Sequence, residues 1–513
     1  MKKKNIPALI LLFLLFLLGT SLQWAMENFG NVTLEQMLFL VQVPTEGVSS
    51  GLVADYLHKA LLPSFLFWLL IVVLSVFPRH SALGLEIKKN PTGTADTGIR
   101  LQFLPLRIPA SAFYFLLLCG FLSVFLKADS TFSVSEYVGR QLQTSSLIEE
   151  EYISPAEVSI SFPEEKRNLI CIYIESAETS AQDTASGGLM PVNYMPELTE
   201  LARENTSFSS SALIEGAACA PGCGWTIAGL VAQTAGVPLM IPTRYRNSMN
   251  ITDNFLPGVV SLGEILEKEG YHNYFMAGSD FTFGGRRQYF TQHGNYQVFD
   301  HPWAAAGHLI PQDYKVWWGF EDEKLFSFAR EKLTEIAARN EPFQFSLLTV
   351  DTHTPNGYVC RLCPDRWPGQ YANVWSCASS QIASFVHWIQ EQDFYENTTI
   401  VLSGDHLSMC PTFYGTQTED DYTGQARRKV YNAFINPAVQ ADETAEKNRR
   451  FTTMDMFPTV LASLGARIEG ERLGLGTNLF SGIPTLSEKL GYPELFTELQ
   501  KKSRFYERTL FYE

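Results

Sequence analysis

Three long apolar segments near the start of the chain constrain the fold most, because each must be removed from water. They cover residues 6–26, 60–77 and 109–126. Each is roughly long enough for a helix that crosses a bilayer core, which takes about 20 residues. The sequence therefore predicts a membrane region with three transmembrane helices over residues 1–127. The first segment could instead be a cleaved signal peptide, but no small-x-small cleavage site follows it and two further apolar segments do.

Basic residues are distributed unevenly around these segments. Lysines precede the first segment, and more basic residues separate the second from the third: Lys2, Lys3, Lys4, then Arg79, Lys88, Lys89, Arg100 and Arg107. Only Lys59 lies between the first and second segments, at the membrane edge. Because positively charged loops remain in the cytoplasm, the N-terminus and the 78–108 loop are expected there. We therefore expect a multi-pass protein of the plasma (inner) membrane, with everything after Lys127 extracytoplasmic.

The chain has a formal net charge of -15, from 54 acidic and 39 basic side chains. This balance argues against a nucleic-acid partner, which needs a basic face. It also disfavours broad adhesion to anionic lipid, so any lipid contact must be local and specific.

Most of the eight cysteines lie in the part expected outside the membrane, where disulfides are permitted. Cys119 falls inside an apolar segment, and Cys171 lies in a strand-like run as a buried thiol. The other six are Cys219, Cys223, Cys360, Cys363, Cys377 and Cys410. The Cys-x-x-Cys at 360–363 could be redox-active or half of a zinc site, but no partner pair with zinc-finger spacing follows. Structural disulfides are favoured; their connectivity is not deducible from sequence, and Cys363–Cys377 is the preferred pair.

The polar residues 128–167 are expected to form a connector, and residues 168–513 a catalytic domain. From residue 168 onward, short β-rich runs alternate with helical patterns. The strand candidates are 168–174, 271–276, 343–350 and 398–403; the helix candidates include 226–234, 258–269, 321–338 and 377–392. This alternation predicts an α/β domain with a mainly parallel central sheet.

Acidic residues follow three of the predicted strands: Glu175, Asp351 and Asp405, the last next to His406. The carboxyl ends of parallel strands meet at one edge of a sheet, so these side chains can share a site. The oxygens of Glu175 and Asp405, with the imidazole of His406, suit Mg²⁺ or Mn²⁺ and could accept Zn²⁺. Asp405 and His406 alone would be interpreted as neighbouring loop residues without a ligand role. The presence of Glu175 at the end of another predicted strand is what favours a metal site.

The glycine-rich stretch Cys219–Leu230 contains Thr226 at the start of a predicted helix. Free amides at a helix N-terminus favour a bound phosphate, and a hydroxyl beside a metal can act as a nucleophile. The alternative is that Thr226 only caps the helix. Cys219-Ala-Pro-Gly-Cys223 is similar to the sulfatase signature Cys-x-Pro-x-Arg, but Cys223 replaces the arginine, so a sulfatase reaction is not expected.

Three further residues are candidates for handling a phosphate. His353 follows a predicted strand, where it could protonate a leaving oxygen or hold a phosphate oxygen. Arg286 and Arg287 could clamp a phosphate. The alternatives are a histidine in a turn and a solvated basic turn.

Several motifs now combine: Trp225-Thr-Ile-Ala-Gly229, Gly236-Val-Pro-Leu239, Trp318-Gly-Phe-Glu-Asp322, Asp351-Thr-His353-Thr-Pro-Asn-Gly357, Asp405-His406-Leu-Ser-Met409 and Phe457-Pro-Thr-Val-Leu461. Over roughly residues 165–480 the chain resembles the phosphoglycerol transferase I and lipoteichoic acid synthase-like family of the alkaline phosphatase and sulfatase superfamily. The match is closer to the branch that modifies osmoregulated periplasmic glucans, which three N-terminal spans also fit. Lipoteichoic acid synthases have a histidine and a tryptophan before the arginine, and Ala277–Gly285 has neither.

The resemblance implies a site for one divalent metal, Mn²⁺ or Mg²⁺ rather than Zn²⁺. Its implied ligands are Glu175, Thr226, Asp405 and His406. Thr226 matches the nucleophile, and His353 and Arg286 match positions that contact the glycerophosphate group. The implied activity is transfer of glycerophosphate from phosphatidylglycerol to a glycan or polyol acceptor, through an intermediate on the threonine. The alternatives are a phosphoethanolamine transferase, a hydrolytic phosphodiesterase or sulfatase, and a non-catalytic surface protein that binds lipid or glycan.

Overall fold

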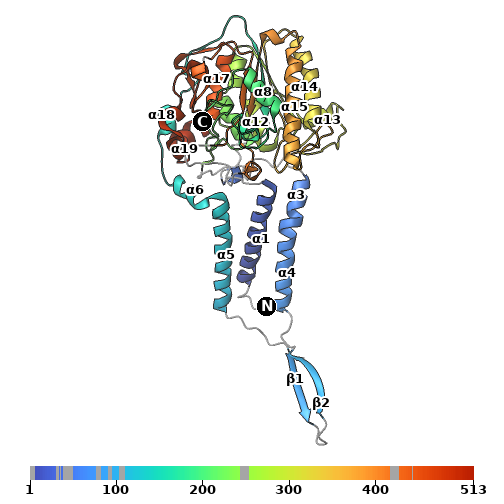
Figure 1. Cartoon of the computed structure of the whole chain (residues 1–513). Helices are drawn as coiled ribbons and strands as arrows, with labels where there is room; N and C mark the ends of the chain where they lie inside the picture. The colour runs from blue at the N-terminus through green and yellow to red at the C-terminus, as the bar shows by residue number, and fades with distance from the viewer. Residues whose placement is uncertain are drawn as a thin grey trace. The chain divides into compact units, whose positions relative to one another are not determined.

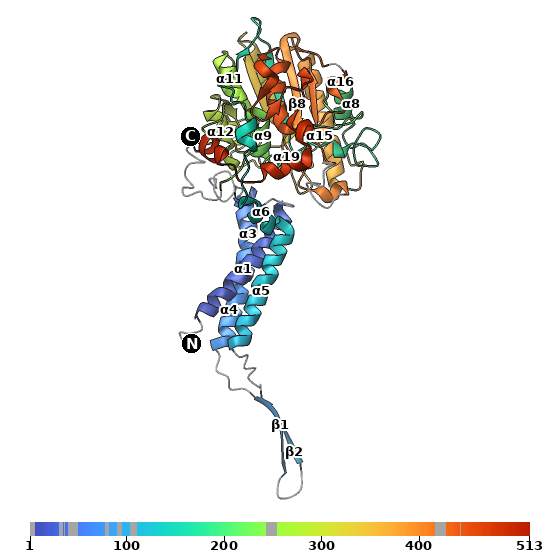
Figure 2. The ribbon, with the colours of Figure 1, turned by 90° about the vertical axis from the view of Figure 1, so that its left-hand side faces the viewer.

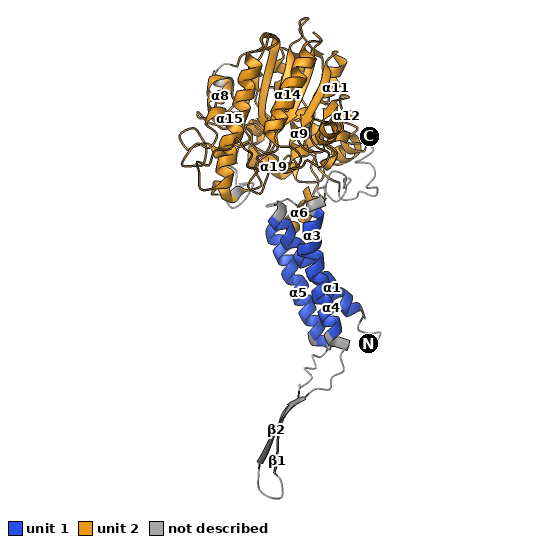
Figure 3. Cartoon of the chain, turned by 90° about the vertical axis from the view of Figure 1, so that its right-hand side faces the viewer, with its two compact units in different colours: residues 1–28, 49–132 blue, residues 29–48, 133–513 orange. Residues whose placement is uncertain are grey.

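The computed structural model of the chain describes residues 6–29, 34, 36–38, 50–76, 82–89, 95–102, 110–242, 254–415, 427–441 and 443–512. The chain divides into two compact units, coloured separately in Figure 3. The first comprises residues 1–28 and 49–132, and the second residues 29–48 and 133–513.

The first unit contains three helical stretches that are long and apolar enough to cross a membrane, as the sequence predicts: Pro7–Glu27, Val53–Val73 and Phe113–Phe132. The first stretch lies in α1 (Ile6–Phe29) and the third in α5 (Ala110–Phe132). The second runs through three consecutive helical elements: α3 (Ser50–Tyr56), the π-helical turn Leu57–Leu61 and α4 (Leu62–Val76). Strands β1 (Ala82–Lys89) and β2 (Ala95–Gln102) form an antiparallel ribbon.

Polar contacts join α1 to α4. The Thr20 hydroxyl lies 2.8 Å from the Ser64 hydroxyl, and the indole of Trp68 donates a 2.9 Å hydrogen bond to the carbonyl of Leu9. In an apolar stretch such groups need internal partners, so these bonds fix how the two helices pack.

The second unit is built on a six-stranded sheet in the order β6-β5-β7-β4-β8-β9. Its strands are β4 (Asn168–Ile174), β5 (His272–Ala277), β6 (Gln297–Phe299), β7 (Phe343–Leu348), β8 (Thr398–Gly404) and β9 (Asn432–Ile435). All neighbours are parallel except β8 and β9. The four predicted strands and the mainly parallel sheet are confirmed.

Helices cover both faces of this sheet (Figures 1 and 2). On β4, Ile170, Ile172 and Ile174 pack into one core with α8 (Pro196–Glu204), α14 (Asp322–Ala337) and α15 (Gln370–Gln390). Leu169, Cys171 and Tyr173 pack into the other, with α9 (Thr226–Ala235), α11 (Leu262–Lys268), α17 (Met456–Ser463) and α19 (Tyr492–Leu499). A strand that is apolar on both faces needs such a layer on each side.

Two helices differ in extent from the sequence pattern. The helix expected at 258–269 begins at Leu262, because Ser261 and Glu264 form a capping box at its start. The helix expected at 377–392 begins earlier, at Gln370. The residues expected as a connector supply α6 (Val134–Gln141), α7 (Leu147–Glu151) and β3 (Ile160–Ser161) to the second unit.

The remaining α-helices and strands of the described residues are short. They are α12 (Arg286–Gln292), α13 (His301–Ala306), α16 (Glu443–Glu446), α18 (Leu486–Leu490), β10 (Arg467–Ile468), which pairs with β3, and the pair β11 (Arg472–Leu473) and β12 (Gly476–Thr477).

Candidate active site

Two adjacent parallel strands deliver the predicted metal ligands to one point. In the register of β4 and β8, Ile174 lies opposite Gly404, so the next residues, Glu175 and Asp405, leave the sheet side by side. Glu175, Asp405 and His406 are buried, and each offers a ligand atom within 4.8 Å of the others.

Hydrogen bonds aim the ligand atoms at a common centre. Asp405 Oδ1 accepts from the backbone amides of Ser176 at 2.7 Å and His406 at 2.8 Å. His406 Nδ1 lies 2.7 Å from the carbonyl of Leu407, which places the proton on Nδ1 and leaves Nε2 with a lone pair. Among the described residues, Asp405 Oδ2 and His406 Nε2 are buried without a hydrogen-bond partner. His406 Nε2 lies 3.4 Å from Asp405 Oδ2 and 3.5 Å from Glu175 Oε1, and buried acceptors grouped this closely fit a cation between them.

The electrostatics of the cluster also favour a cation. Burial, followed by the charge of Glu175, raises the pKa of Asp405 well above its ordinary value. Burial acts in the same direction on Glu175, but His353, His406 and nearby hydrogen bonds hold its pKa below the ordinary value. Two carboxylates this close cannot both be ionised cheaply unless a positive charge lies between them. The donor set of two carboxylates and one imidazole therefore fits a divalent metal.

Helix α9 is held against this cluster by a glycine. A Cβ atom on Gly229 would lie 2.0 Å from the carbonyl oxygen of Asp405, so only glycine permits the close approach. Gln233, one turn further, donates a 2.9 Å hydrogen bond to the carbonyl of Gly404. These contacts hold α9 against the loop that carries Asp405, and Thr226 at the start of the helix lines a cavity with Glu175.

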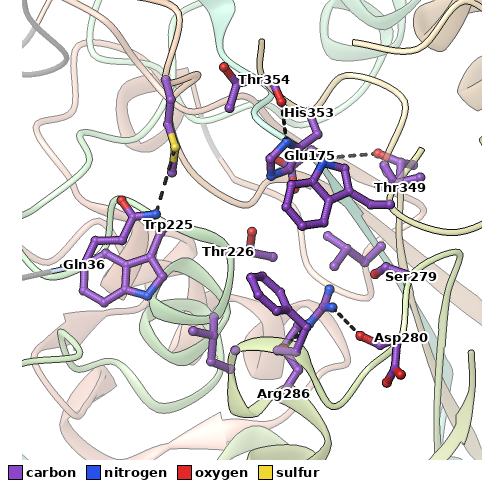
Figure 4. A pocket seen from close by; sticks show the side chains of 17 residues that line it. Gln36, Glu175, Trp225, Thr226, Ser279, Asp280, Arg286, Thr349, His353 and Thr354 are labelled. Carbon is purple, nitrogen blue, oxygen red and sulfur yellow. Dashed lines mark hydrogen bonds between the residues drawn. The ribbon is translucent and has the colours of Figure 1, made fainter. Parts of the chain in front are cut away.

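Thr226 does not occupy the cap position. The N-cap residue of α9 is Trp225, with extended backbone angles and no side-chain cap bond, and Thr226 is the first helical residue. The capping alternative is therefore wrong. The Thr226 side chain lines a cavity together with Glu175, His353 and Arg286, as Figure 4 shows.

The structure separates the two predicted arginines. Arg286, the first residue of α12, lines the cavity and is anchored by hydrogen bonds to the carbonyls of Phe283 at 3.0 Å and Asp280 at 2.7 Å. Burial lowers the pKa of Arg286 to about 10, so its guanidinium stays charged near neutral pH. Arg287 instead pairs with the buried carboxylate of Asp300 and is not among the lining residues. The expected two-arginine clamp is thus reduced to Arg286.

His353 reaches the cavity from the turn after β7. Its Nδ1 lies 2.7 Å from the carbonyl of Thr354, and its ring packs on Trp318 with a centroid separation of 4.7 Å. Burial lowers the pKa of His353, while the charge of Glu175 opposes that change. A histidine fixed in this way can exchange protons with a ligand in the cavity.

Asp351 does not join the Glu175–Asp405–His406 cluster, although the sequence places it after a strand of the same sheet. It lies next to Asp322, whose carboxylate oxygens accept the backbone amides of Val350 at 2.8 Å and Asp351 at 3.1 Å. Within the described part of the chain, both carboxylate oxygens of Asp351 are buried without a hydrogen-bond partner. The turn after β7 therefore directs His353 into the cavity and Asp351 away from it.

An ion pair braces the loop that carries Asp405 and His406. Arg428 pairs with the buried Glu178, and it also donates a 2.6 Å hydrogen bond to the carbonyl of Ser408. Glu178 in turn accepts the amide of Ser408 at 3.3 Å. No sequence pattern pointed to this pair, because its members are far apart in the chain.

The cysteines also differ from expectation. Cys219 and Cys223 are buried and do not line the cavity, so the sulfatase-like signature contributes no reacting group to it. Cys363 and Cys377 form no disulfide, and the preferred pairing is wrong: both are thiols clustered with Cys360, which lies equally close to each.

Gln36 is a cavity residue that sequence reasoning missed. It belongs to the second unit, although it lies in the chain between α1 and α3, and its amide contacts the sulfur of Met409 (Figure 4). Nothing in the local sequence marks the segment between the first two apolar stretches as part of a distant cavity.

The family model for sulfatases matches residues 167–466, more than half of the 513 residues. The chain belongs to the sulfatase family. Membership of this family confirms the α/β domain that the alternation of strand and helix patterns predicts.

Curated relatives include phosphoglycerol transferase I of Citrobacter koseri, 33% identical over 341 residues, and that of Escherichia coli strain 55989, 32% identical over 335 residues. These matches confirm the family resemblance. They cover 65% and 64% of this chain but only 41% and 40% of the relatives, so the chain spans about two fifths of their length. Among solved structures, the lipoteichoic acid synthase LtaP from Listeria monocytogenes is similar with a TM-score of 0.48 and 17% identity, over 66% of this chain and 82% of that one.

Proposed function

We propose that this protein is a metal-dependent phosphoglycerol transferase that moves glycerophosphate from phosphatidylglycerol to a hydroxyl of a glycan or polyol. The observation that carries the proposal is the cavity in which Thr226 faces Glu175, with His353 and Arg286 on the remaining walls. The relatives named phosphoglycerol transferase I support the choice of headgroup.

The proposed metal ligands are Glu175, Thr226, Asp405 and His406, with Mn²⁺ or Mg²⁺ as the metal and Zn²⁺ less favoured. When bound, the metal supplies charge that polarises a phosphoryl oxygen and lowers the pKa of a nearby hydroxyl. Hard carboxylate oxygens outnumber the single nitrogen, which is the reason for preferring Mn²⁺ or Mg²⁺.

In the first half-reaction the Thr226 oxygen attacks the phosphorus of the lipid headgroup. A bond forms between Thr226 and phosphorus, and the bond to the diacylglycerol oxygen breaks. The hydroxyl proton of Thr226 leaves to water, and His353 donates a proton to the diacylglycerol oxygen. Arg286 and the free amides at the start of α9 hold the anionic phosphate oxygens during this step.

In the second half-reaction an acceptor hydroxyl attacks the same phosphorus. His353, now neutral, accepts the acceptor's proton, and the Thr226 oxygen leaves and takes a proton from water. The protein returns to its starting state, and the acceptor carries the glycerophosphate group. The same histidine thus acts first as an acid and then as a base.

The apolar helices fit a lipid donor. We propose that the three stretches cross the inner membrane, that the basic segments remain cytoplasmic, and that residues after Lys127 lie outside. A membrane-attached catalytic unit stays close to lipid headgroups.

The test uses purified protein, Mn²⁺ and phosphatidylglycerol labelled in its glycerol headgroup. Intact mass is expected to show one glycerophosphate group on the wild type and none on Thr226→Ala, with diacylglycerol released only by the former. Thr497→Ala is the matched control, because Thr497 is an exposed threonine on α19. If phosphatidylethanolamine instead labels the protein, the activity is that of a phosphoethanolamine transferase. Release of glycerophosphate to water with an acceptor present would indicate hydrolysis, and no reaction with either lipid would favour a binding protein.

A further inference from the structure

A second cluster of potential ligands lies outside the catalytic cavity. The sulfur atoms of Cys360, Cys363 and Cys377 all lie within 4.8 Å of one another. Cys360 Sγ is 3.7 Å from Cys363 Sγ and 3.7 Å from Cys377 Sγ. None of the three lines the catalytic cavity.

The separations match shared coordination of one ion. Two bonded sulfurs lie about 2.05 Å apart, and Cys360 does not approach either partner that closely. Tetrahedral zinc binds thiolates at about 2.3 Å, which places two sulfurs on one ion about 3.8 Å apart. The observed distances are close to this value for both neighbours of Cys360.

Local structure directs the three sulfurs to one point. Cys360 and Cys363 lie on a tight turn in which the Cys363 amide donates a 3.1 Å hydrogen bond to the carbonyl of Cys360. Cys377 lies on α15, where Gln381 follows one helical turn later on the same side. The Gln381 amide nitrogen lies 3.3 Å from Cys377 Sγ and 3.8 Å from Cys360 Sγ. An N–H donor shared by two sulfurs is the outer hydrogen bond that metal-bound thiolates commonly accept.

We propose that Cys360, Cys363 and Cys377 bind a Zn²⁺ ion as thiolates, with a water molecule as the fourth ligand. Cys360 and Cys377 are buried, while Cys363 is partly exposed and leaves room for water. Thiolates select zinc over the hard cations proposed for Glu175 and Asp405. This site does not depend on the proposed transfer reaction.

The zinc site would tie two parts of the domain together. The turn that holds Cys360 and Cys363 belongs to the segment between β7 and α15, which also carries His353. Cys377 is fixed within α15, a helix packed in the core. The ion would therefore anchor the far end of the segment that positions His353.

The experiment uses the full-length protein, depleted of metal under reducing conditions and refilled with Co²⁺. Cobalt bound to thiolates gives charge-transfer absorption that cobalt on oxygen and nitrogen ligands does not. We expect this absorption in the wild type, in His406→Ala and in Cys119→Ser, whose exposed thiol lies in α5. We expect it to be lost in Cys363→Ser.

Zinc content provides the second measurement. His406→Ala, purified without added metal, is expected to keep one zinc per chain, and His406→Ala combined with Cys363→Ser to lose it. The proposal is overturned if the wild type shows no charge transfer, or if its unreduced peptides contain a disulfide between any two of Cys360, Cys363 and Cys377. Because both of these measurements are made on the wild type, a folding defect in a cysteine variant would not protect the proposal.

Discussion

In the part of the chain that the structure describes, two residues of the Glu175–Asp405–His406 cluster keep buried polar atoms without a hydrogen-bond partner. Asp405 Oδ2 and His406 Nε2 are buried and lack hydrogen-bond partners among the described residues. Leaving such a buried group unsatisfied costs about 1–3 kcal/mol, so the folded state gains when a cation binds. In the proposed metal site, these residues would lower the stability of the metal-free protein and raise its affinity for a cation.

His353 is expected to be needed for proton transfer and not for folding. His353→Gln should lower the transfer rate by about 10²–10⁴-fold, which is the usual contribution of a positioned acid or base. With the wild type, the steady-state rate should fall above the lowered pKa of His353, where the first half-reaction lacks its acid, and also below it, where the second half-reaction lacks its base; the variant should lack both dependences. Steady-state transfer measured against pH checks both effects. His387→Gln, at an exposed position on α15, should leave the rate and its pH profile unchanged.

Asp351 should make the folded protein less stable as the pH rises. Burial, together with Asp322, raises the pKa of Asp351 far above the value of about 3.9 in an unfolded chain. Above about pH 4 the folded state therefore holds a proton that the unfolded state has lost, and its free energy of unfolding falls with increasing pH. The side chain in Asp351→Asn does not ionise in this range. The free energy of unfolding of the variant minus that of the wild type should therefore increase from pH 5 to pH 8.

Denaturant unfolding at several pH values measures this difference. Asp393→Asn changes an exposed carboxylate and should give a curve parallel to the wild type. If Asp351→Asn also stays parallel to the wild type, Asp351 is ionised in the folded protein and the argument fails.

At the level of elements, the site depends on how α9 meets the ends of β4 and β8. The two strands fix Glu175 and Asp405 through their register, and the helix brings Thr226 to them. Gly229 has no Cβ atom, and the carbonyl oxygen of Asp405 occupies the space that a Cβ would need. This contact sets the distance between α9 and the edge of the sheet.

Gly229→Ala should therefore push α9 away from the metal cluster. Overpacking of this kind costs about 1–3 kcal/mol, and the shift should lower both metal affinity and labelling of Thr226. Mn²⁺ titration and intact mass measure the two effects. Gly369→Ala is the control, since a Cβ atom there meets nothing within 4 Å. Normal labelling in Gly229→Ala would show that the helix position is not critical.

On the scale of the whole molecule, the chain joins a membrane-type unit to a catalytic unit. The catalytic unit also takes in residues 29–48, and Gln36 from this segment lines the cavity. If the first unit spans the membrane as we propose, attachment would raise the effective concentration of a lipid donor around the site.

A form that begins at Ser133 should fold, because the sheet and both cores are built from later residues. We expect this form to act on a soluble short-chain phosphatidylglycerol. Its rate on vesicles should be lower than that of the full chain by about 10²-fold or more, since it is no longer held at the membrane surface. Rates with the two substrates test this. Fusion to an unrelated membrane helix should restore the vesicle rate if anchoring is what matters. Failure of that fusion, with the soluble rate intact, would assign a further role to the segment that contains Gln36.

Much of the fold and part of the site can be derived from local sequence. The strands at 168–174 and 398–403 are continuous apolar runs, and the residue after such a run must leave the sheet at its carboxyl edge. That is why Glu175, Asp405 and His406 could be predicted together. The three apolar stretches are likewise a property of local composition, which alone decides whether a helix can cross a lipid bilayer.

Tertiary structure decided what depends on contacts between distant residues. It turned Arg286 into the cavity and Arg287 toward Asp300, although the two are neighbours in sequence. It also brought Gln36 to the cavity and grouped Cys360 with Cys363 and Cys377. Local sequence fixes the period and the ends of strands and helices, but the direction of a side chain in a turn is set by the partners that packing brings to it.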